Sequence, residues 1–537
     1  MTHPVPPPVN EPVLSFAPGT AERSRLAEAL KTVGGECREI PVHIGGRSVT
    51  TGRLVDVVSP HRHAHVLARA HEAGEKETQG AIDAAMAAWP SWSAMRFEDR
   101  AAIFLRAADL LAGPHRDRVN AACMLGQSKT CHQAEIDAVC ELVDFFRFNV
   151  HFLRKLHDEQ PISPPGTWNR SELRPLEGFV FAVAPFNFLS IAVNLPMAPI
   201  LCGNVAVWKP STTSLLGCHE VLALLREAGL PDGVLNMIPG DGVLQGKVAL
   251  DSPHLAGIHF TGSTGTFRSL WRGVGERLDR YRSFPRIVGE TGGKDFILAH
   301  PSADAAALAT AIMRGGFEYQ GQKCSAASRV YVPRSLWGAV RQQLADETPQ
   351  MKVGDPADFS TFVGAVIDER AYTRITGYQQ LAKDTATVLV GGGASKTEGY
   401  FVDPTIAVVD DPAHRLMTEE IFGPVVSVFV YEDAQWDSTL EIVDGTSPYA
   451  LTGAVFSTDR AALAQAEQRL RHAAGNFYIN DKPTGAVVSQ QPFGGARASG
   501  TNDKAGSFYN LTRWISPRSI KETLVPPKDW RYPFLGK

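Results

Sequence analysis

Short apolar runs alternate with longer amphipathic stretches over much of this chain. The runs at 178–183, 204–208 and 256–260 are typical of strands that are buried on both faces of a parallel sheet. Apolar residues at helical spacing occupy the intervening stretches at about 191–202 and 211–228. This alternation of strands and helices along the chain predicts a doubly wound α/β sheet.

The same alternation begins again near Phe296 and predicts a second α/β region. Its expected helices lie at 303–319 and 334–348, and its expected strands at 329–332, 388–391, 425–431, 450–456 and 475–479. Before the first sheet, the segment 161–174 contains three prolines and a glycine, so it interrupts the pattern.

The stretch from Gly178 to Trp208 has no charged residue and is long enough to span a bilayer. Pro185, Pro196 and Pro199 interrupt it, and three asparagines would each place an amide in lipid. We therefore expect the core of a parallel sheet here rather than a membrane span.

Composition narrows the class of protein. The 537 residues include 53 Lys and Arg against 57 Asp and Glu, a formal charge of −4, and 44% are hydrophobic. These figures describe a globular chain long enough for several domains and exclude collagen, a disordered chain and a small disulfide scaffold. Because the charge is balanced, we expect neither nucleic acid nor an anionic membrane surface as a partner.

Seven cysteines without metal or redox spacing argue against a disulfide framework and favour a reducing compartment. The proline-rich segment 1–18 lacks the apolar core of a secretory signal. Four glutamates within the first 36 residues do not fit a mitochondrial presequence. The sequence therefore predicts a cytoplasmic protein that begins with an extended arm.

Two motifs that follow predicted strands could contact a nucleotide. The segment 260–266 lies between a strand and a helix, where backbone N–H groups can hold a pyrophosphate and Ser263 can add a hydroxyl. Lys209 ends a buried strand, at the edge where such sheets bind ligands. From the residues alone, a plain tight turn and an ordinary solvated lysine remain open.

Three further residues have the chemistry of a nucleophilic site. Cys324 lies beside Lys323 and Ser325, where a neighbouring cation would favour the thiolate; we expect the other six cysteines to be buried hydrophobes. Glu290 directly follows a buried strand and could act as a general base or be a surface acid. The amide of Asn187, at the tip of the first strand, could donate to an oxyanion.

His61, His63 and His65 alternate, so they would share one face of a strand. Histidines on one face are one pattern of a zinc site. No carboxylate or cysteine lies at close spacing to complete it, so we expect a solvated strand face and no bound metal.

In chain order these motifs resemble the aldehyde dehydrogenase superfamily, from about residue 40 to the C-terminus. The matching segments are Pro-Phe-Asn-Phe (185–188), Trp-Lys-Pro (208–210), Phe-Thr-Gly-Ser (260–263), Glu-Thr-Gly-Gly-Lys (290–294), Gly-Gln-Lys-Cys (321–324), Glu-Glu-Ile-Phe-Gly-Pro (419–424) and Pro-Phe-Gly-Gly (492–495). A closer resemblance, to the 1-pyrroline-5-carboxylate dehydrogenases, rests on the segments 126–130, 141–149, 186–188, 321–326 and 494–503. Leu189 and Thr291 replace the superfamily's usual proline and leucine, and neither change touches a catalytic atom.

The resemblance implies an α/β fold with two doubly wound, Rossmann-like domains and a β-flap that mediates oligomerisation. The expected parts are an N-terminal arm (1–40), an NAD-binding domain (41–290) with the flap (160–178) inserted, a catalytic domain (291–490) and a last segment (491–537) with the substrate anchor loop and further oligomer contacts. An aromatic tail near Trp530 would be costly to expose on a monomer. We therefore expect a homodimer or a larger homo-oligomer.

The family's roles can be placed on the matching residues. Cys324 would be the nucleophile, Asn187 and the Cys324 N–H would hold the oxyanion, and Glu290 would activate water. The implied NAD contacts are Lys209, Ser211, Gly262, Ser263, Glu420, Phe422 and Phe186. The implied contacts of a substrate with an α-carboxylate are Ser325, Gly506, Ser507, Phe188, Trp514, Glu141 and Lys323.

The implied reaction is the NAD-dependent oxidation of L-glutamate γ-semialdehyde to L-glutamate in proline breakdown. The alternative within this class is another short semialdehyde with a carboxylate, such as succinate semialdehyde. A cysteine hydrolase without nicotinamide and a silent homologue are alternatives from other classes, against which the nucleotide motifs and the retained Cys324 argue. Preference between NAD and NADP stays open, because Ser211 stands where many NAD-specific relatives have an acid.

Overall fold

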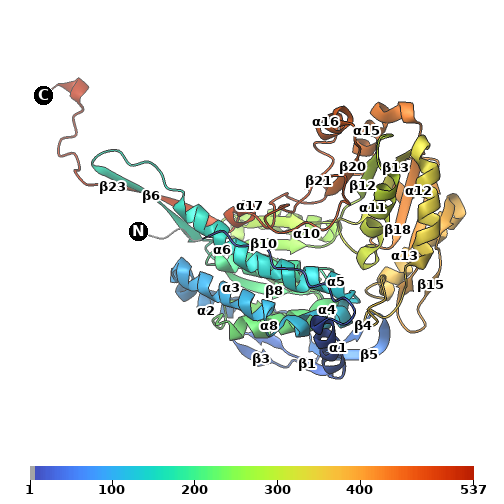
Figure 1. The fold of residues 1–537 in the computed structure, drawn as a ribbon. Coiled ribbons are helices and arrows are strands. Elements are labelled where there is room, and N and C mark those ends of the chain that lie inside the picture. Colours follow the sequence, from blue (N-terminus) through green and yellow to red (C-terminus); the bar gives the residue numbers. More distant parts are fainter. Residues whose placement is uncertain (1–5, 537) are drawn as a thin grey trace.

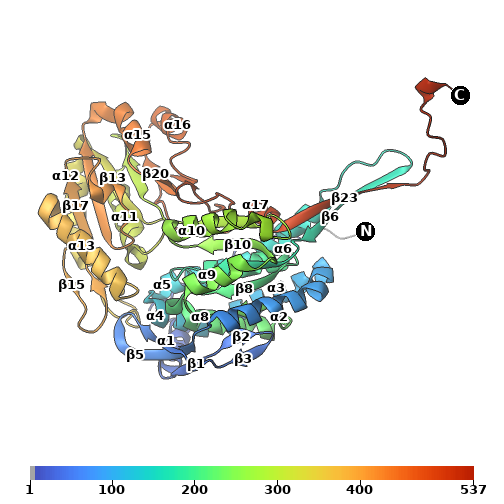
Figure 2. The same ribbon diagram turned by 180° about the vertical axis from the view of Figure 1, so that it is seen from behind.

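Two seven-stranded sheets form the framework of the computed structural model, which describes residues 6–536 (Figures 1 and 2). The strands of the first sheet are β2 (Val42–Ile44), β3 (Arg47–Val49), β7 (Phe179–Val183), β8 (Val205–Lys209), β9 (Leu235–Met237), β10 (Leu255–Thr261) and β11 (Arg286–Glu290). Their order is β11-β10-β7-β8-β9-β2-β3, parallel from β11 to β9 and antiparallel at β2. The strands predicted at 178–183, 204–208 and 256–260 are confirmed.

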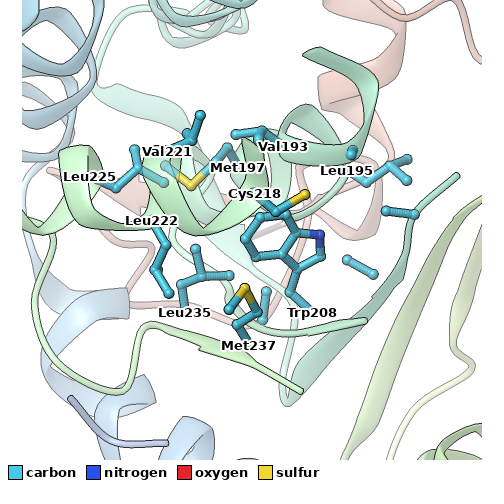
Figure 3. Close-up of a cluster of buried hydrophobic side chains, with 14 of the residues drawn as sticks. Val193, Leu195, Met197, Trp208, Cys218, Val221, Leu222, Leu225, Leu235 and Met237 are labelled. Atoms are coloured by element: carbon cyan, nitrogen blue, oxygen red, sulfur yellow. The ribbon is translucent and has the colours of Figure 1, made fainter. Parts of the chain in front are cut away.

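Helices pack on this sheet and bury its apolar strands. They include α2 (Glu75–Ala94), α3 (Phe97–Ala112), α4 (Arg116–Gln127), α6 (Leu142–Asp158), α7 (Leu189–Leu201), α8 (Leu215–Glu227), α9 (Gly242–Asp251) and α10 (Thr264–Gly275). Figure 3 shows the ring of Trp208 on β8 among Cys218 of α8, Met197 of α7 and Met237 of β9. The stretch 178–208 is therefore the strand, helix and strand of a buried core, and no helix in the described chain is long and apolar enough to cross a membrane.

The second sheet carries the other half of the molecule. Its strands are β12 (Asp295–Ala299), β13 (Ala327–Pro333), β14 (Thr387–Val390), β17 (Thr405–Val409), β18 (Val425–Tyr431), β20 (Thr452–Phe456) and β21 (Asn476–Ile479), in the order β14-β17-β18-β13-β12-β20-β21. Its helices include α11 (Ala305–Phe317), α12 (Arg334–Glu347), α13 (Glu369–Thr385), α14 (Arg415–Thr418), α15 (Trp436–Gly445) and α16 (Arg460–Arg469). Apart from the edge strand β14, which is antiparallel, the sheet is parallel. The predicted fold class of two doubly wound α/β sheets is confirmed.

A two-stranded ribbon projects from the body of the molecule (Figures 1 and 2). It pairs β6 (Thr167–Pro175) with β23 (Ile515–Thr523) in antiparallel register along nine residues of each strand. The segment near 160–178 and the C-terminal stretch, which the resemblance joined as a flap, are thus neighbours in space. Beyond the ribbon, Trp530, Tyr532 and Phe534 are exposed.

The arm expected at 1–40 contains the helix α1 (Ala21–Gly34), and residues 1–5 lie outside the described part. Two details of the sequence interpretation are wrong. Of the six cysteines expected in the core, Cys37 is exposed and Cys131 is half-buried. The expected solvated histidine face is wrong because His61 is buried at the tip of the hairpin of β4 (Leu54–Ser59) and β5 (Arg62–His71), against the second sheet's domain.

Candidate active site

Turns that follow strands and helices of both sheets converge on one thiol. Glu290 ends β11, and the link after it leads directly into β12 of the second sheet. Cys324 lies just before β13, and Glu420 lies between α14 and β18. The N–H of Gly293 donates to Oε1 of Glu420 at 2.9 Å, so the Glu290 and Glu420 turns are held together.

The turn before Cys324 has an unusual backbone. Tyr319, Gln320 and Gly321 have φ values of 51°, 55° and 63°, which are left-handed and costly for residues other than glycine. The buried amide of Gln320 donates to the carbonyls of Ser128 (2.9 Å) and Ala365 (2.8 Å). Contacts from both domains therefore fix the position of the thiol.

The Cys324 thiol is buried, and its pKa lies well above the ordinary value, first because of burial and then because of nearby carboxylates such as Glu290. The expectation that Lys323 favours the thiolate is wrong. The ammonium of Lys323 lies 2.9 Å from Oε2 of Glu318, and this ion pair neutralises it. The raised pKa disfavours the thiolate, so a base that removes the proton would assist attack by the sulfur.

Glu290 reaches into the site from the end of β11. Its Oε2 accepts the N–H of Gly495 at 3.0 Å, and a Cβ at Gly494 would lie only 3.1 Å from Oε1. Burial raises the pKa of Glu290 well above its ordinary value, while Lys504 acts in the opposite direction. Glu290 is therefore not an exposed surface acid, which was the alternative that the sequence left open.

Asn187 lies beside the same turn. Its Nδ2 donates to the carbonyl of Gln322 at 3.1 Å, two residues before Cys324. This bond uses one of the two N–H groups of the amide, so the other can donate to an oxygen on a carbon bound to sulfur. The structure brings the three predicted catalytic residues together.

A buried ion pair lies next to the segment that carries Asn187. The ammonium of Lys129 contacts the carboxylate of Asp137, and both side chains are buried. Asp137 also accepts the first two backbone N–H groups of α7, at 2.9 and 3.0 Å. Lys129 lies 4.4 Å from the ring centroid of Phe188 and 4.5 Å from that of Tyr319, so it joins the Asn187 tip to the Cys324 turn.

A cavity of about 400 Å³ opens beside Cys324. Its lining includes four residues that the resemblance implied, namely Phe188, Glu141, Lys323 and Ser325. It also includes residues that sequence reasoning missed, namely Asn10, Glu11, Val13, Asp144, Phe493 and the loop 484–488. Burial and the neighbouring Asp137 raise the pKa of Glu141 to about 8.

Three implied substrate contacts lie elsewhere. Ser507 caps the short helix α17 (Phe508–Thr512), and its hydroxyl donates to the carbonyl of Lys504 at 2.6 Å. Gly506 packs behind the loop 484–488, where a Cβ would lie 3.4 Å from Val488. Trp514 is fully buried against His259 of β10, with ring centroids 4.7 Å apart. None of the three lines the cavity beside Cys324, so their placement there is corrected.

A second cavity, of about 790 Å³, opens at the carboxyl ends of the first sheet's strands. Its lining includes five of the implied NAD contacts, namely Phe186, Lys209, Ser211, Gly262 and Ser263. Ser263 caps α10, so the positive end of that helix faces the cavity. Burial lowers the pKa of Lys209, while Asp241 and Glu72 raise it. A basic side chain beside a helix N-terminus fits the ribose and pyrophosphate of a dinucleotide.

The other two implied cofactor contacts line neither cavity. Phe422 packs edge-on against Phe186, which lines the second cavity, with ring centroids 5.8 Å apart. Glu420 accepts the N–H of Gly293, and burial raises its pKa. Glu420 is also one of the carboxylates that raise the pKa of Cys324, so it lies near the thiol.

Comparison with known proteins decides the family. The model of the Aldehyde dehydrogenase family matches residues 47–520, which is most of the chain. The chain belongs to this family.

Three relatives of this chain are pyrroline-5-carboxylate dehydrogenases. Delta-1-pyrroline-5-carboxylate dehydrogenase, mitochondrial, of Mus musculus is 50% identical over 529 residues, covering 98% of this chain and 94% of that protein. The Delta-pyrroline-5-carboxylate dehydrogenase from Mycobacterium tuberculosis bound with NAD is 52% identical with a TM-score of 0.96, each chain being covered completely. The R100A mutant of the Thermus thermophilus 1-pyrroline-5-carboxylate dehydrogenase is 33% identical with a TM-score of 0.91, covering 97% and 99%.

One missed part of the site had a signal in the sequence. The loop 484–488 follows β21, and ligands bind at the carboxyl ends of such strands. Phe493 lies within the Pro-Phe-Gly-Gly segment that carried the resemblance. No local sequence pattern predicts Asn10 or Asp144 as residues of the cavity, because they line it through contacts between distant segments.

Proposed function

We propose that this aldehyde dehydrogenase oxidises L-glutamate γ-semialdehyde, the open form of 1-pyrroline-5-carboxylate, to L-glutamate with NAD. The observation that carries the proposal is the composition of the cavity beside Cys324. It combines the aromatic rings of Phe188 and Phe493 with charged and hydroxyl groups. Such a lining suits a short aliphatic aldehyde with an ammonium and a carboxylate at its far end. The three relatives named above support the same substrate.

Catalysis begins with the buried thiol. The proton of Cys324 passes to the Glu290 carboxylate and from there to solvent. The thiolate attacks the aldehyde carbon, so that a C–S bond forms while the C=O π bond opens to an oxyanion. The second N–H of Asn187 and the backbone N–H of Cys324 donate to this oxygen, and one such donor is commonly worth about 3–4 kcal/mol. NAD supplies the hydride acceptor, and the carbon left on sulfur is a thioester. Glu290 then takes a proton from water, which attacks the thioester and releases L-glutamate and the thiol.

We assign the dinucleotide to the second cavity. Lys209 and Ser211 would contact the adenosine ribose, and Ser263 with the first N–H groups of α10 would hold the pyrophosphate. Glu420 would orient the nicotinamide ribose beside Phe422. These roles divide the molecule into a cofactor-binding part (41–290) and a catalytic part (291–490).

Within the substrate cavity, we assign Ser325 and the loop 484–488 to the α-carboxylate. The hydroxyl of Ser325 lies 2.8 Å from that of Thr484. The N–H groups of Gly485 and Ala486 have no acceptor among residues 6–536. Free N–H groups and hydroxyls can bind an anion without an arginine. Glu141 and Lys323 lie in the same cavity and would face the substrate's charged end.

NADH absorbance tests this proposal directly. The substrates are 1-pyrroline-5-carboxylate, succinate semialdehyde and hexanal, each with NAD and with NADP. We expect the highest kcat/KM for 1-pyrroline-5-carboxylate with NAD and no NADH formation by Cys324→Ala. A higher kcat/KM for succinate semialdehyde would show that this aldehyde is the substrate instead. A higher kcat/KM for hexanal would contradict the proposed carboxylate site.

We also propose that the protein is a homo-oligomer that acts in the cytoplasm. The exposed aromatic tail at Trp530, Tyr532 and Phe534 and the projecting ribbon are surfaces that a second copy can cover. Sedimentation that shows a monomer at micromolar concentration would contradict the oligomer. The mouse relative is named as mitochondrial, so fractionation against matrix and cytosolic markers would test the compartment.

A further inference from the structure

The N-terminal arm lies against the substrate cavity. Asn10, Glu11 and Val13 line the same cavity as Cys324. In Figure 1 the dark blue trace runs from the N-terminal end past α6 to α1. Residues more than 300 positions from the nucleophile therefore form part of its surroundings.

Buried charges hold this arm in place. Glu11 accepts hydrogen bonds from Arg116 and Arg147, both at 2.7 Å, and its side chain is only 10% exposed. The N–H of Leu14 donates to Glu135 at 3.0 Å. Removing one partner from a buried ion pair is strongly unfavourable, so the arm stays docked as a fixed wall.

Asn10 connects two walls of the cavity. Its Nδ2 donates to Oδ2 of Asp144 on α6 (2.8 Å) and to the carbonyl of Val488 (3.0 Å). Its Oδ1 accepts the amide of Gln490 at 3.0 Å. Asn10 thus fastens both ends of the turn 488–490 to α6.

We propose that the arm is a specificity element, in which Asn10 is a positioning residue that holds the loop 484–488 at the distance required by the charged end of the substrate. This inference rests on the proposed function. Gly485 and Ala486 lie in the clamped loop, and their free N–H groups can bind a carboxylate only while the loop keeps its position. An uncharged aldehyde makes no use of these N–H groups.

The test compares Asn10→Ala with Val9→Ala, a neighbour that is 80% exposed and does not line the cavity. We expect Asn10→Ala to raise KM for 1-pyrroline-5-carboxylate about tenfold, as for the loss of one or two hydrogen bonds, with kcat within about twofold. KM for hexanal should change less than about twofold, and Val9→Ala should match the wild type for both substrates. Gln490→Ala should raise the same KM, and the double variant should be less than additive.

Hydrogen exchange supplies a readout that does not depend on activity. In Asn10→Ala, amides of 484–490 should exchange about tenfold faster than in the wild type and in Val9→Ala. Equal KM changes for both aldehydes, or an unchanged exchange rate, would overturn the positioning role. A wild-type enzyme that does not oxidise 1-pyrroline-5-carboxylate would instead overturn the proposed function, and exchange would still decide whether Asn10 clamps the loop.

Discussion

Replacing Lys129 by methionine tests how much the ion pair beneath the site contributes to the fold. The side chains of Lys129 and Asp137 are 1% and 0% exposed. Methionine has a similar length but no charge, so Asp137 would stay buried without its cation. Breaking a buried pair by removing one partner commonly costs about 3–5 kcal/mol.

The contacts of Asp137 set the expected loss within that range. Asp137 keeps three donors, namely two N–H groups of α7 and the hydroxyl of Ser190 at 2.6 Å, so we expect about 3 kcal/mol. Loss of the cation–π contacts with Phe188 and Tyr319 adds about 1 kcal/mol. At about 2–4 °C per kcal/mol for a domain of this size, Tm should fall by roughly 8–16 °C.

Thermal unfolding at one scan rate measures this shift. Lys155→Met on α6, where the lysine is exposed, is the matched control and should stay within about 0.5 kcal/mol of the wild type. Adding Asp137→Asn should reveal a coupling of at least about 1.5 kcal/mol between the two sites. An additive double variant, or a Tm for Lys129→Met equal to that of Lys155→Met, would refute the reasoning.

Three other predictions concern the chemistry of the site. Glu290→Gln should release one equivalent of NADH per site and then turn over about 10²–10⁴-fold more slowly, with the thioester on Cys324 detected by mass spectrometry; a linear time course would contradict this. Alkylation of Cys324 by iodoacetamide should keep accelerating above pH 9, because its pKa is raised, and the profile should move to lower pH in Glu290→Gln; a plateau below pH 8 would count against it. Glu141 has a folded pKa of about 8, so the native state binds the extra proton and stability should fall as pH rises from about 5 to 8. Tm of Glu141→Gln should fall less over this interval than Tm of the wild type, and equal slopes would contradict the assignment.

The sheets were predictable because periodicity is local. Strands such as β7, β8 and β10 are continuous apolar runs, and the helices between them have their own spacing. The nucleotide cavity was predictable for a related reason. Lys209 and Ser263 each follow a strand of one parallel sheet, and the carboxyl ends of its strands share an edge.

The substrate cavity was harder to predict, because it depends on which loops face inward. Gly506 and Ser507 have the composition of an anion-binding loop, yet they pack behind the loop 484–488 that lines the cavity. Trp514 resembles a wall residue but fills the first domain's core. A sequence shows that a loop can bind an anion, whereas its orientation follows from packing between distant segments.

Residues from both domains hold Cys324 in place, so many of its neighbours are distant from it in the sequence. The left-handed turn before Cys324 is costly in isolation, and Gln320 offsets that cost by bonding to Ser128 of the first domain and Ala365 of the second. The hydroxyl of Ser128 also accepts the N–H of Ala365 at 2.8 Å and contacts His61 at 3.1 Å. The turn that carries the thiol is therefore bonded to both domains. The burial of His61, unexpected from its sequence, is a consequence of building one site at the junction of two sheets.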